Sequence, residues 1–249
     1  MRINFFLATS NPFFDAYSQS DLLGKMIFLG LYALSICTWV ILIYKVWKTY
    51  QAKRFALRFQ ESFRMQRSHP LSLEFENVTN GVGNPFLDLY KVLKKQAQDL
   101  LSKNRHFSSG NSPSHGPKEV HLSLSDIDVI ASHLSIQVLQ QVRNLEKHLY
   151  VLATSVSLAP FLGLLGTVWG ILTTFSELQA QGSGGSHQMV LSGLSMALAT
   201  TVLGLIVAIP ALIGYNYLKS VVRDFGTEME GFSNEILAAV ELQYRKVDI

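Results

Sequence analysis

The chain has 249 residues, of which 48% are hydrophobic and only 16% are charged, and its mean hydropathy is +0.22. This composition is too apolar for a typical soluble domain and is typical of a protein that crosses a membrane several times. The formal net charge of +3 does not indicate a nucleic-acid partner, because the basic residues follow the pattern of a membrane topology. We therefore expect an all-α protein of the lipid bilayer, with three transmembrane helices and long helices that extend into the cytoplasm.

The first 44 residues predict an interfacial segment and the first membrane span. Residues 1–25 are polar and aromatic, and Asn11 and Pro12 are suited to begin a helix, although a flexible tail is the alternative interpretation. Residues 26–44 contain no charged residue and no histidine, and their length suits a helical span. Basic residues follow this span at once, at Lys45, Lys48, Lys53, Arg54 and Arg58. The positive-inside rule therefore places the N-terminus outside and the following residues in the cytoplasm.

Residues 45–148 form the predicted cytoplasmic insertion, which holds 15 of the 21 Lys and Arg residues. Asn84 and Pro85 are typical of a helix start, and apolar residues recur behind them at helical spacing. Residues 104–121 are rich in Ser, Gly, Pro and His and predict a linker. Ser123 and Ser125 each precede an aspartate by three residues, as in a capping box, and open a helix with one apolar face. Because no helix-breaking residue follows, we expect this helix to run without interruption into the second span.

The second span is predicted over residues 149–176, which contain no Asp, Glu, Lys, Arg or His. Small residues recur within it every three or four positions, so another backbone can approach this face closely. These residues are Ala159, Gly163, Gly166, Thr167, Gly170 and Thr174. Thr167 has two interpretations. In the structural one its hydroxyl bonds to a carbonyl one turn earlier, and in the functional one it faces a pore or a partner helix.

The third span repeats this design over residues 189–218, after a short outer loop at residues 177–188. Pro210 lies deep in this span, where helices in lipid tolerate a kink if neighbours support it. Residues 219–249 begin with Lys219 and continue as a helix, which places the C-terminus in the cytoplasm. The second stripe of small residues comprises Gly193, Ala197, Thr200, Thr201, Gly204, Ala208 and Ala211. Together the two stripes predict a tight helix bundle around a shared polar seam.

Two stretches of these spans carry a resemblance to a known family. The first comprises Ala159-Pro160 and Gly163-Leu164-Leu165-Gly166-Thr167-Val168-Trp169-Gly170-Ile171. The second comprises Ala197-Leu198, Thr201, Gly204-Leu205, Ala208-Ile209-Pro210-Ala211 and Tyr215-Asn216. In them the chain resembles the MotA/TolQ/ExbB proton-channel family, and more closely its TolQ and ExbB members. The resemblance covers about residues 149–218 well and the rest only in layout. One departure is Met196, because several ExbB and TolQ members carry a glutamate there.

The resemblance implies an inner-membrane subunit of a bacterial motor that is driven by the proton-motive force. It implies a cyclic homo-oligomer, expected to be a pentamer, whose second and third spans enclose a small ExbD- or TolR-like partner with one span and a membrane Asp. A TonB- or TolA-like protein would carry the work to the outer membrane, for transport or for envelope maintenance. The polar pore positions of the family match Thr167 and Thr201, with Thr200 as a weaker candidate. We expect close packing and helix shape to be the roles of Gly163, Gly166, Gly170, Gly204 and Pro210.

Sequence motifs of enzymes are absent. The seven histidines form no His-Glu-x-x-His pair, there is no Gly-x-Ser-x-Gly elbow, and the glycines at 182–185 lack a Walker lysine. Cys37 is the only cysteine, so no disulfide forms within the chain. We therefore expect no enzymatic activity, no cofactor and no metal. The alternative to a motor subunit is a non-conducting membrane scaffold, which Met196 in place of a carboxylate favours. A neighbouring gene for a one-span protein with a membrane Asp would favour the motor.

Overall fold

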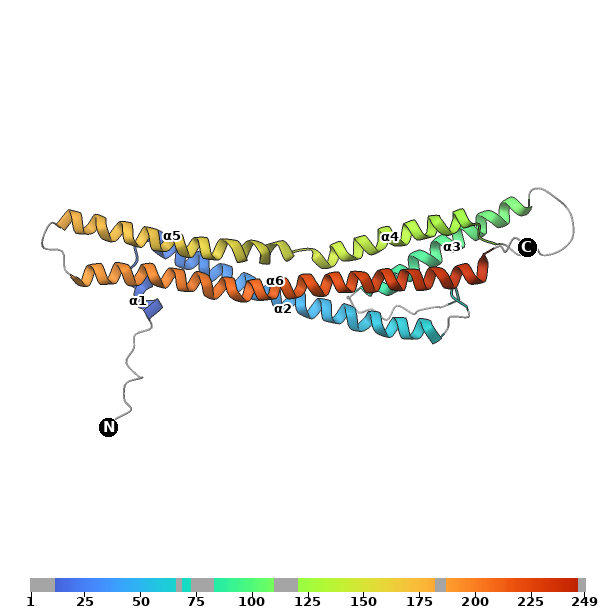
Figure 1. Ribbon diagram of the computed structural model, residues 1–249, viewed down its shortest axis with the longest axis horizontal. Coiled ribbons are helices and arrows are strands. Elements are labelled where there is room, and N and C mark those ends of the chain that lie inside the picture. Colours follow the sequence, from blue (N-terminus) through green and yellow to red (C-terminus); the bar gives the residue numbers. More distant parts are fainter. Residues whose placement is uncertain (1–11, 66–68, 73–82, 110–120, 182–186, 246–249) are drawn as a thin grey trace, which may run out of the picture. The chain divides into compact units, whose positions relative to one another are not determined.

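The computed structural model describes residues 12–65, 69–72, 83–109, 121–181 and 187–245. Within these ranges the chain forms six helices, which Figure 1 shows in sequence colours. They are α1 (Pro12–Gln19), α2 (Leu22–Met65), α3 (Pro85–Ser109), α4 (Leu124–Glu146), α5 (Leu149–Gln181) and α6 (His187–Tyr244). Three of them, α2, α5 and α6, are long and apolar enough to cross a membrane. The expected all-α fold with three candidate spans is therefore confirmed.

Two of the candidate membrane helices are much longer than a span. Helix α2 has 44 residues and α6 has 58. At 1.5 Å per residue, α6 measures about 87 Å, whereas the hydrocarbon core of a bilayer is about 30 Å thick. Each of these helices therefore combines an apolar span with a polar extension in one continuous element.

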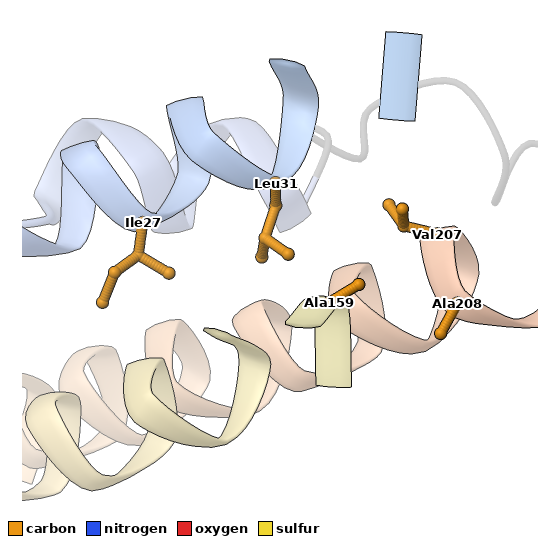
Figure 2. Close-up of a cluster of buried hydrophobic side chains, with 5 residues drawn as sticks. All are labelled: Ile27, Leu31, Ala159, Val207 and Ala208. Atoms are coloured by element: carbon orange, nitrogen blue, oxygen red, sulfur yellow. The ribbon is translucent and has the colours of Figure 1, made fainter. Parts of the chain in front are cut away.

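The chain divides into two compact units, and the first contains the candidate spans. It takes its residues from Met1–Tyr44 and His148–Leu218. Figure 2 shows Ile27 and Leu31 of α2 pointing toward α5 and α6, where Ala159, Val207 and Ala208 complete a buried apolar cluster. The alanines let the helices approach closely, as small residues do in membrane bundles. A second cluster joins Ala16 of α1, Phe28 of α2 and Met196 of α6.

The second unit takes its residues from Lys45–Lys147 and Lys219–Ile249 and has an aromatic core. The rings of Phe86 on α3 and Phe232 on α6 stack with their centroids 4.4 Å apart. The α6 stripe in this unit is buried as expected, at Val222, Phe225, Met229, Phe232, Ile236 and Val240.

Polar side chains join α2 and α6 within this second unit. Lys53 Nζ lies 2.7 Å from Glu228 Oε1, and Gln60 Nε2 donates to Glu235 Oε2 at 3.1 Å. Both pairs join residues that are 175 positions apart in the sequence. The two helices run in the same direction here, because residue numbers rise together along them.

The predicted helix starts of α3 and α4 are confirmed by their caps. Asn84 Oδ1 accepts the backbone N–H of Phe86 at 3.1 Å, and Pro85 is the first residue of α3. Ser123 and Asp126 form the complete reciprocal capping box that opens α4. The start of α1 at Pro12 also agrees with the prediction, whereas Asn11 lies outside the described residues.

The predicted linker at residues 104–121 is partly wrong. Helix α3 continues to Ser109, so residues 104–109 are helical, and residues 110–120 lie outside the described ranges. The amide of Asn104 donates to His121 O at 3.2 Å and to Asp126 Oδ2 at 3.0 Å. These two bonds connect the last turns of α3 to the start of α4 and give the polar residue a structural role within the helix.

The prediction of one uninterrupted helix through residues 124–176 is also wrong. Helix α4 ends at Glu146 and α5 begins at Leu149, and His148 between them has a φ of 73°. A positive φ is uncommon for a residue other than glycine. The buried Lys45 donates from Nζ to Leu145 O at 3.0 Å and so satisfies one carbonyl that the break leaves without a helical partner.

Candidate functional site

The two stripes of small residues face each other where α5 and α6 pack together. A Cβ atom added to Gly204 would lie 2.6 Å from Ala159 O and 3.2 Å from Gly163 Cα. A Cβ atom added to Gly163 would lie 3.0 Å from both Thr200 O and Thr201 Cα. The backbones of α5 and α6 are therefore in direct contact, and neither glycine leaves room for a side chain. We refer to this contact, formed by Ala159, Gly163, Gly166, Thr200, Thr201 and Gly204, as the seam.

Two threonine hydroxyls of α6 converge on one carbonyl of α5 in this seam. Thr201 Oγ1 donates to Gly163 O at 3.1 Å. Thr200 Oγ1 is 2.8 Å from Ala197 O in its own helix and 3.4 Å from Gly163 O. Thr200 is fully buried, whereas Thr201 is partly exposed. The side chain of Thr200 also fills the space beside Gly166, which explains the need for a glycine there.

Thr167 is not part of this convergence. Its Oγ1 donates to Leu164 O at 2.7 Å, within its own helix, and the residue is partly exposed. This bond is the one that the structural interpretation of Thr167 requires. The exposed part of the side chain is free to meet a lipid or a second protein.

The remaining predicted residues lie farther along the same two helices. A Cβ atom added to Gly170 would lie 3.1 Å from Ala197 Cβ and 3.2 Å from Met196 Cε. Pro210 is partly exposed, and α6 continues through it to Tyr244. Met196 is only 5% exposed and packs against Ala16 and Phe28, so its side chain belongs to the interior of the first unit.

One polar contact of the first unit has no counterpart in the sequence predictions. Trp169 Nε1 donates to Asp21 Oδ2 at 2.7 Å, and the backbone N–H of Gly24 donates to Asp21 Oδ1 at 2.8 Å. Asp21 is the residue before α2 and therefore caps that helix. An acid just before a long apolar run is a signal for a helix cap, but it does not indicate a bond to a tryptophan in another span.

The described part of the chain contains no candidate metal site. No group of three or more His, Cys, Asp or Glu side chains there could hold a metal ion. The polar groups of the seam are hydroxyls and carbonyls, which form hydrogen bonds but do not exchange protons near neutral pH.

Comparison with known proteins gives one family match. The model of the MotA/TolQ/ExbB proton channel family matches residues 85–231, which is more than half of the chain. The matched region includes α5 and the seam part of α6.

Individual relatives carry related names. The chain is 32% identical over 224 residues to the biopolymer transport protein ExbB of Pseudomonas putida, a match that covers 90% of this chain and 62% of that protein. It is 25% identical to the Tol-Pal system protein TolQ of Haemophilus influenzae, covering 89% of this chain and 92% of TolQ. It is 27% identical to the biopolymer transport protein ExbB of Salmonella typhimurium, a match that covers 99% of this chain and 92% of that protein. The chain thus spans less than two thirds of the Pseudomonas relative but most of the other two.

Proposed function

Because the chain belongs to the MotA/TolQ/ExbB proton channel family, we propose that it is the multi-pass subunit of a TolQ- or ExbB-type motor. The observation that carries this proposal is the family match across both seam helices. In the proposal the protein lies in the bacterial inner membrane, with its N-terminus outside and its C-terminus in the cytoplasm. Several copies, expected to be five, surround the span of a small ExbD- or TolR-like protein. A TonB- or TolA-like protein then transmits the work to the outer membrane.

The seam supports a rigid role for α5 and α6 in such a motor. Direct backbone contact at Gly163 and Gly204 leaves little freedom for the two helices to slide. A rigid pair of helices is a suitable wall against which a partner helix moves. In this proposal Gly163, Gly166, Gly170, Gly204 and Pro210 maintain packing and helix shape rather than contact protons.

The acid that carries protons is expected to come from the partner. Residues 26–44, 149–176 and 189–218 contain no Asp, Glu, Lys, Arg or His, and threonine hydroxyls do not titrate in the physiological range. Thr167 and Thr201 are both partly exposed, so each could orient a partner carboxyl or its water. Thr200 is buried and bonded inside the chain, which makes it the weaker candidate.

Proton flux in liposomes tests this division of roles. The purified protein without a partner is expected to show no fast, gradient-driven flux. Co-purification from the native host, followed by mass spectrometry, should identify a one-span protein with a membrane Asp, and adding it should restore coupled flux. Fast flux through the protein without its partner would overturn the proposal.

Valine substitutions test the two threonines, because valine keeps the shape and removes the hydroxyl. The Thr167→Val/Thr201→Val double variant should impair coupling more than assembly. Thr173→Val is the matched control, since Thr173 is also bonded to carbonyls of its own helix but lies outside the predicted pore positions. A fully coupled double variant would refute the assignment of these hydroxyls.

Cysteine labelling tests the proposed topology. In a Cys37→Ser background, cysteines at Ser109 and Ser183 are exposed in intact cells to a reagent that does not cross the inner membrane. Ser183→Cys should react and Ser109→Cys should be protected. The opposite pattern would reverse the orientation.

A non-conducting scaffold is the second candidate function, and Met196 favours it. Met196 cannot titrate, and it is buried among apolar side chains. Stable assembly of the protein with no one-span partner in the co-purified material would support the scaffold over the motor.

A further inference from the structure

A mostly apolar cavity of about 610 Å³ lies between α1, α2 and α6 in the first unit. Its wall combines side chains from residues 13–17 of α1, residues 28–35 of α2 and residues 203–207 of α6. Helix α1 is held against α2 here, because the ring of Tyr17 meets the ring of Phe28 edge-on with 6.0 Å between their centroids. The volume lies within the range of about 300–1,000 Å³ that is common for ligand sites.

The α2 and α6 walls of this cavity lie at the depth of the hydrocarbon core. Both belong to charge-free runs of the sequence, at residues 26–44 and 189–218. Leu31 and Val207 form a buried floor, and Figure 2 shows both side chains in the apolar cluster between the helices. Tyr32 also lines the cavity and is 68% exposed, so the cavity opens on the surface of the unit. At this depth the opening meets hydrocarbon rather than water.

A cation continues the α2 wall toward the membrane surface. Lys25 lies one turn before Phe28, and Tyr32 and Ser35 follow at helical spacing, so these residues share one face of α2. Among the described residues, none forms a hydrogen bond or an ion pair with the partly exposed Lys25 side chain. Asp21, one turn farther out, accepts hydrogen bonds from Trp169 and Gly24 instead. A lysine near the end of a span extends its ammonium group toward the lipid headgroups.

The size of the cavity favours a lipid chain over a protein helix as its occupant. The α2 wall from Phe28 to Ser35 is about 10 Å long at 1.5 Å per residue. A helix is about 10–12 Å wide with its side chains, so this length of it would occupy roughly 800–1,200 Å³. That volume exceeds the cavity, whereas an acyl chain is much thinner. An apolar cavity below a cation also matches the two parts of a phospholipid, which are an acyl chain and a phosphate.

We propose that the cavity binds one acyl chain of an anionic phospholipid whose phosphate contacts the ammonium group of Lys25. The lipid belongs to the leaflet in which α2 begins. Its chain lies against Leu31 and Val207, and α1 covers it beside Tyr17. The protein therefore retains this lipid, while the other lipids around its spans exchange freely. The site requires neither a partner protein nor proton flow, so it is independent of the proposed motor.

A photoactivatable lipid tests this site in the full-length protein. The probe is phosphatidylglycerol with a photoactivatable group in its acyl chain, added at increasing mole fractions to phosphatidylcholine nanodiscs. Mass spectrometry then maps the labelled peptides. Labelling of residues 28–35 and 203–207 should saturate, because one site is filled. Labelling of the remaining exposed surface of the spans should rise in proportion to the mole fraction of the probe.

Substitutions at the two ends of the site provide the variants. Ser35→Leu fills the cavity, so the saturable labelling should be lost. Cys37→Leu is the matched control, because it adds the same number of atoms to α2 at an exposed position outside the lining, and it should retain the labelling. Lys25→Gln should raise the half-saturating mole fraction about fivefold, as expected for one basic residue near the membrane surface. Lys147→Gln, an exposed lysine outside the first unit, should leave it unchanged.

Three results would overturn the proposal. Labelling of the cavity that rises in proportion to the probe, or that is equal in Ser35→Leu, would show that only exchanging lipid reaches it. A cavity that the probe does not label would show that a second copy of the chain or a partner helix covers it. An unchanged half-saturating mole fraction in Lys25→Gln would refute the headgroup contact, and this variant tests the site even if Ser35→Leu folds poorly.

Discussion

Gly204→Ala adds one methyl group at the glycine of the seam that lies nearest to a backbone atom of the facing helix. The added Cβ would lie 2.6 Å from Ala159 O, a backbone atom that cannot rotate away, whereas ordinary contacts begin at 3.4 Å. The helices must therefore separate locally by about 0.8 Å, which is the difference between these two distances. The Thr201 Oγ1–Gly163 O bond lies one turn away and would lengthen from 3.1 Å to about 3.9 Å, which is beyond hydrogen-bonding distance.

The energetic cost of this substitution follows from these changes. Overpacking costs about 1–3 kcal/mol, and the lost interhelical bond adds about 0.6 kcal/mol. Alanine recovers up to about 1 kcal/mol, because it favours a helix more than glycine does. We expect Gly204→Ala to reduce the free energy of unfolding by about 1–3 kcal/mol.

Gly30→Ala is the matched control for this substitution. Gly30 lies in the same unit, in α2, and a Cβ atom there would meet nothing within 4 Å. This variant should be neutral or more stable by up to about 1 kcal/mol. Equilibrium unfolding of the two variants in mixed micelles, followed by circular dichroism, measures the difference. Equal stability of Gly204→Ala and Gly30→Ala would show that the backbones of α5 and α6 are not in direct contact.

Four further predictions concern other contacts. Gly170→Leu should destabilise the α5–α6 pair through Ala197 and thereby reduce assembly, and an unchanged oligomer in native mass spectrometry would contradict this. Ser123→Ala should cost about 1 kcal/mol in thermal unfolding through loss of the α4 cap. Burial raises the pKa of Asp126, but hydrogen bonds from Ser123 and Asn104 outweigh it and hold that pKa below its usual value. The stabilisation from this carboxylate should therefore be present above about pH 4 and be lost as the pH falls through the lower folded value. Lys45→Met leaves Leu145 O without its donor and should accelerate backbone hydrogen exchange around residues 145–151. Unchanged exchange would show that this bond does not stabilise the break between α4 and α5.

Features that depend on neighbouring residues could be predicted from the sequence. The spans follow from runs without charge, and the starts of α3 and α4 follow from Asn84 and Ser123, whose partners lie within three residues. The small-residue stripes indicated a close approach of helices because their spacing matches the helical period. These signals are local, and the structure agrees with them.

Features that depend on contacts between distant residues could not be predicted. The break at His148 has no proline or glycine to mark it, and the Leu145 carbonyl that it leaves without a helical partner is satisfied by Lys45, 100 positions away. The bond from Trp169 to Asp21 spans 148 positions. The direction of each threonine hydroxyl depends on the rotation of its helix about its own axis, which residue spacing does not determine. This rotation separates Thr201, which bonds across the seam, from Thr167, which bonds within its own helix.

The polar pairs between α2 and α6 restrict how the lengths of these helices can change. Lys53–Glu228 and Gln60–Glu235 repeat at an interval of seven residues on both helices. Deletion of one residue between the pairs would rotate one partner by about 100° and bring unlike faces together. An insertion or deletion should therefore be tolerated best when both helices change by the same seven residues, which is about 10.5 Å of rise. Evolution of longer or shorter extensions would then proceed in coordinated steps of two helical turns.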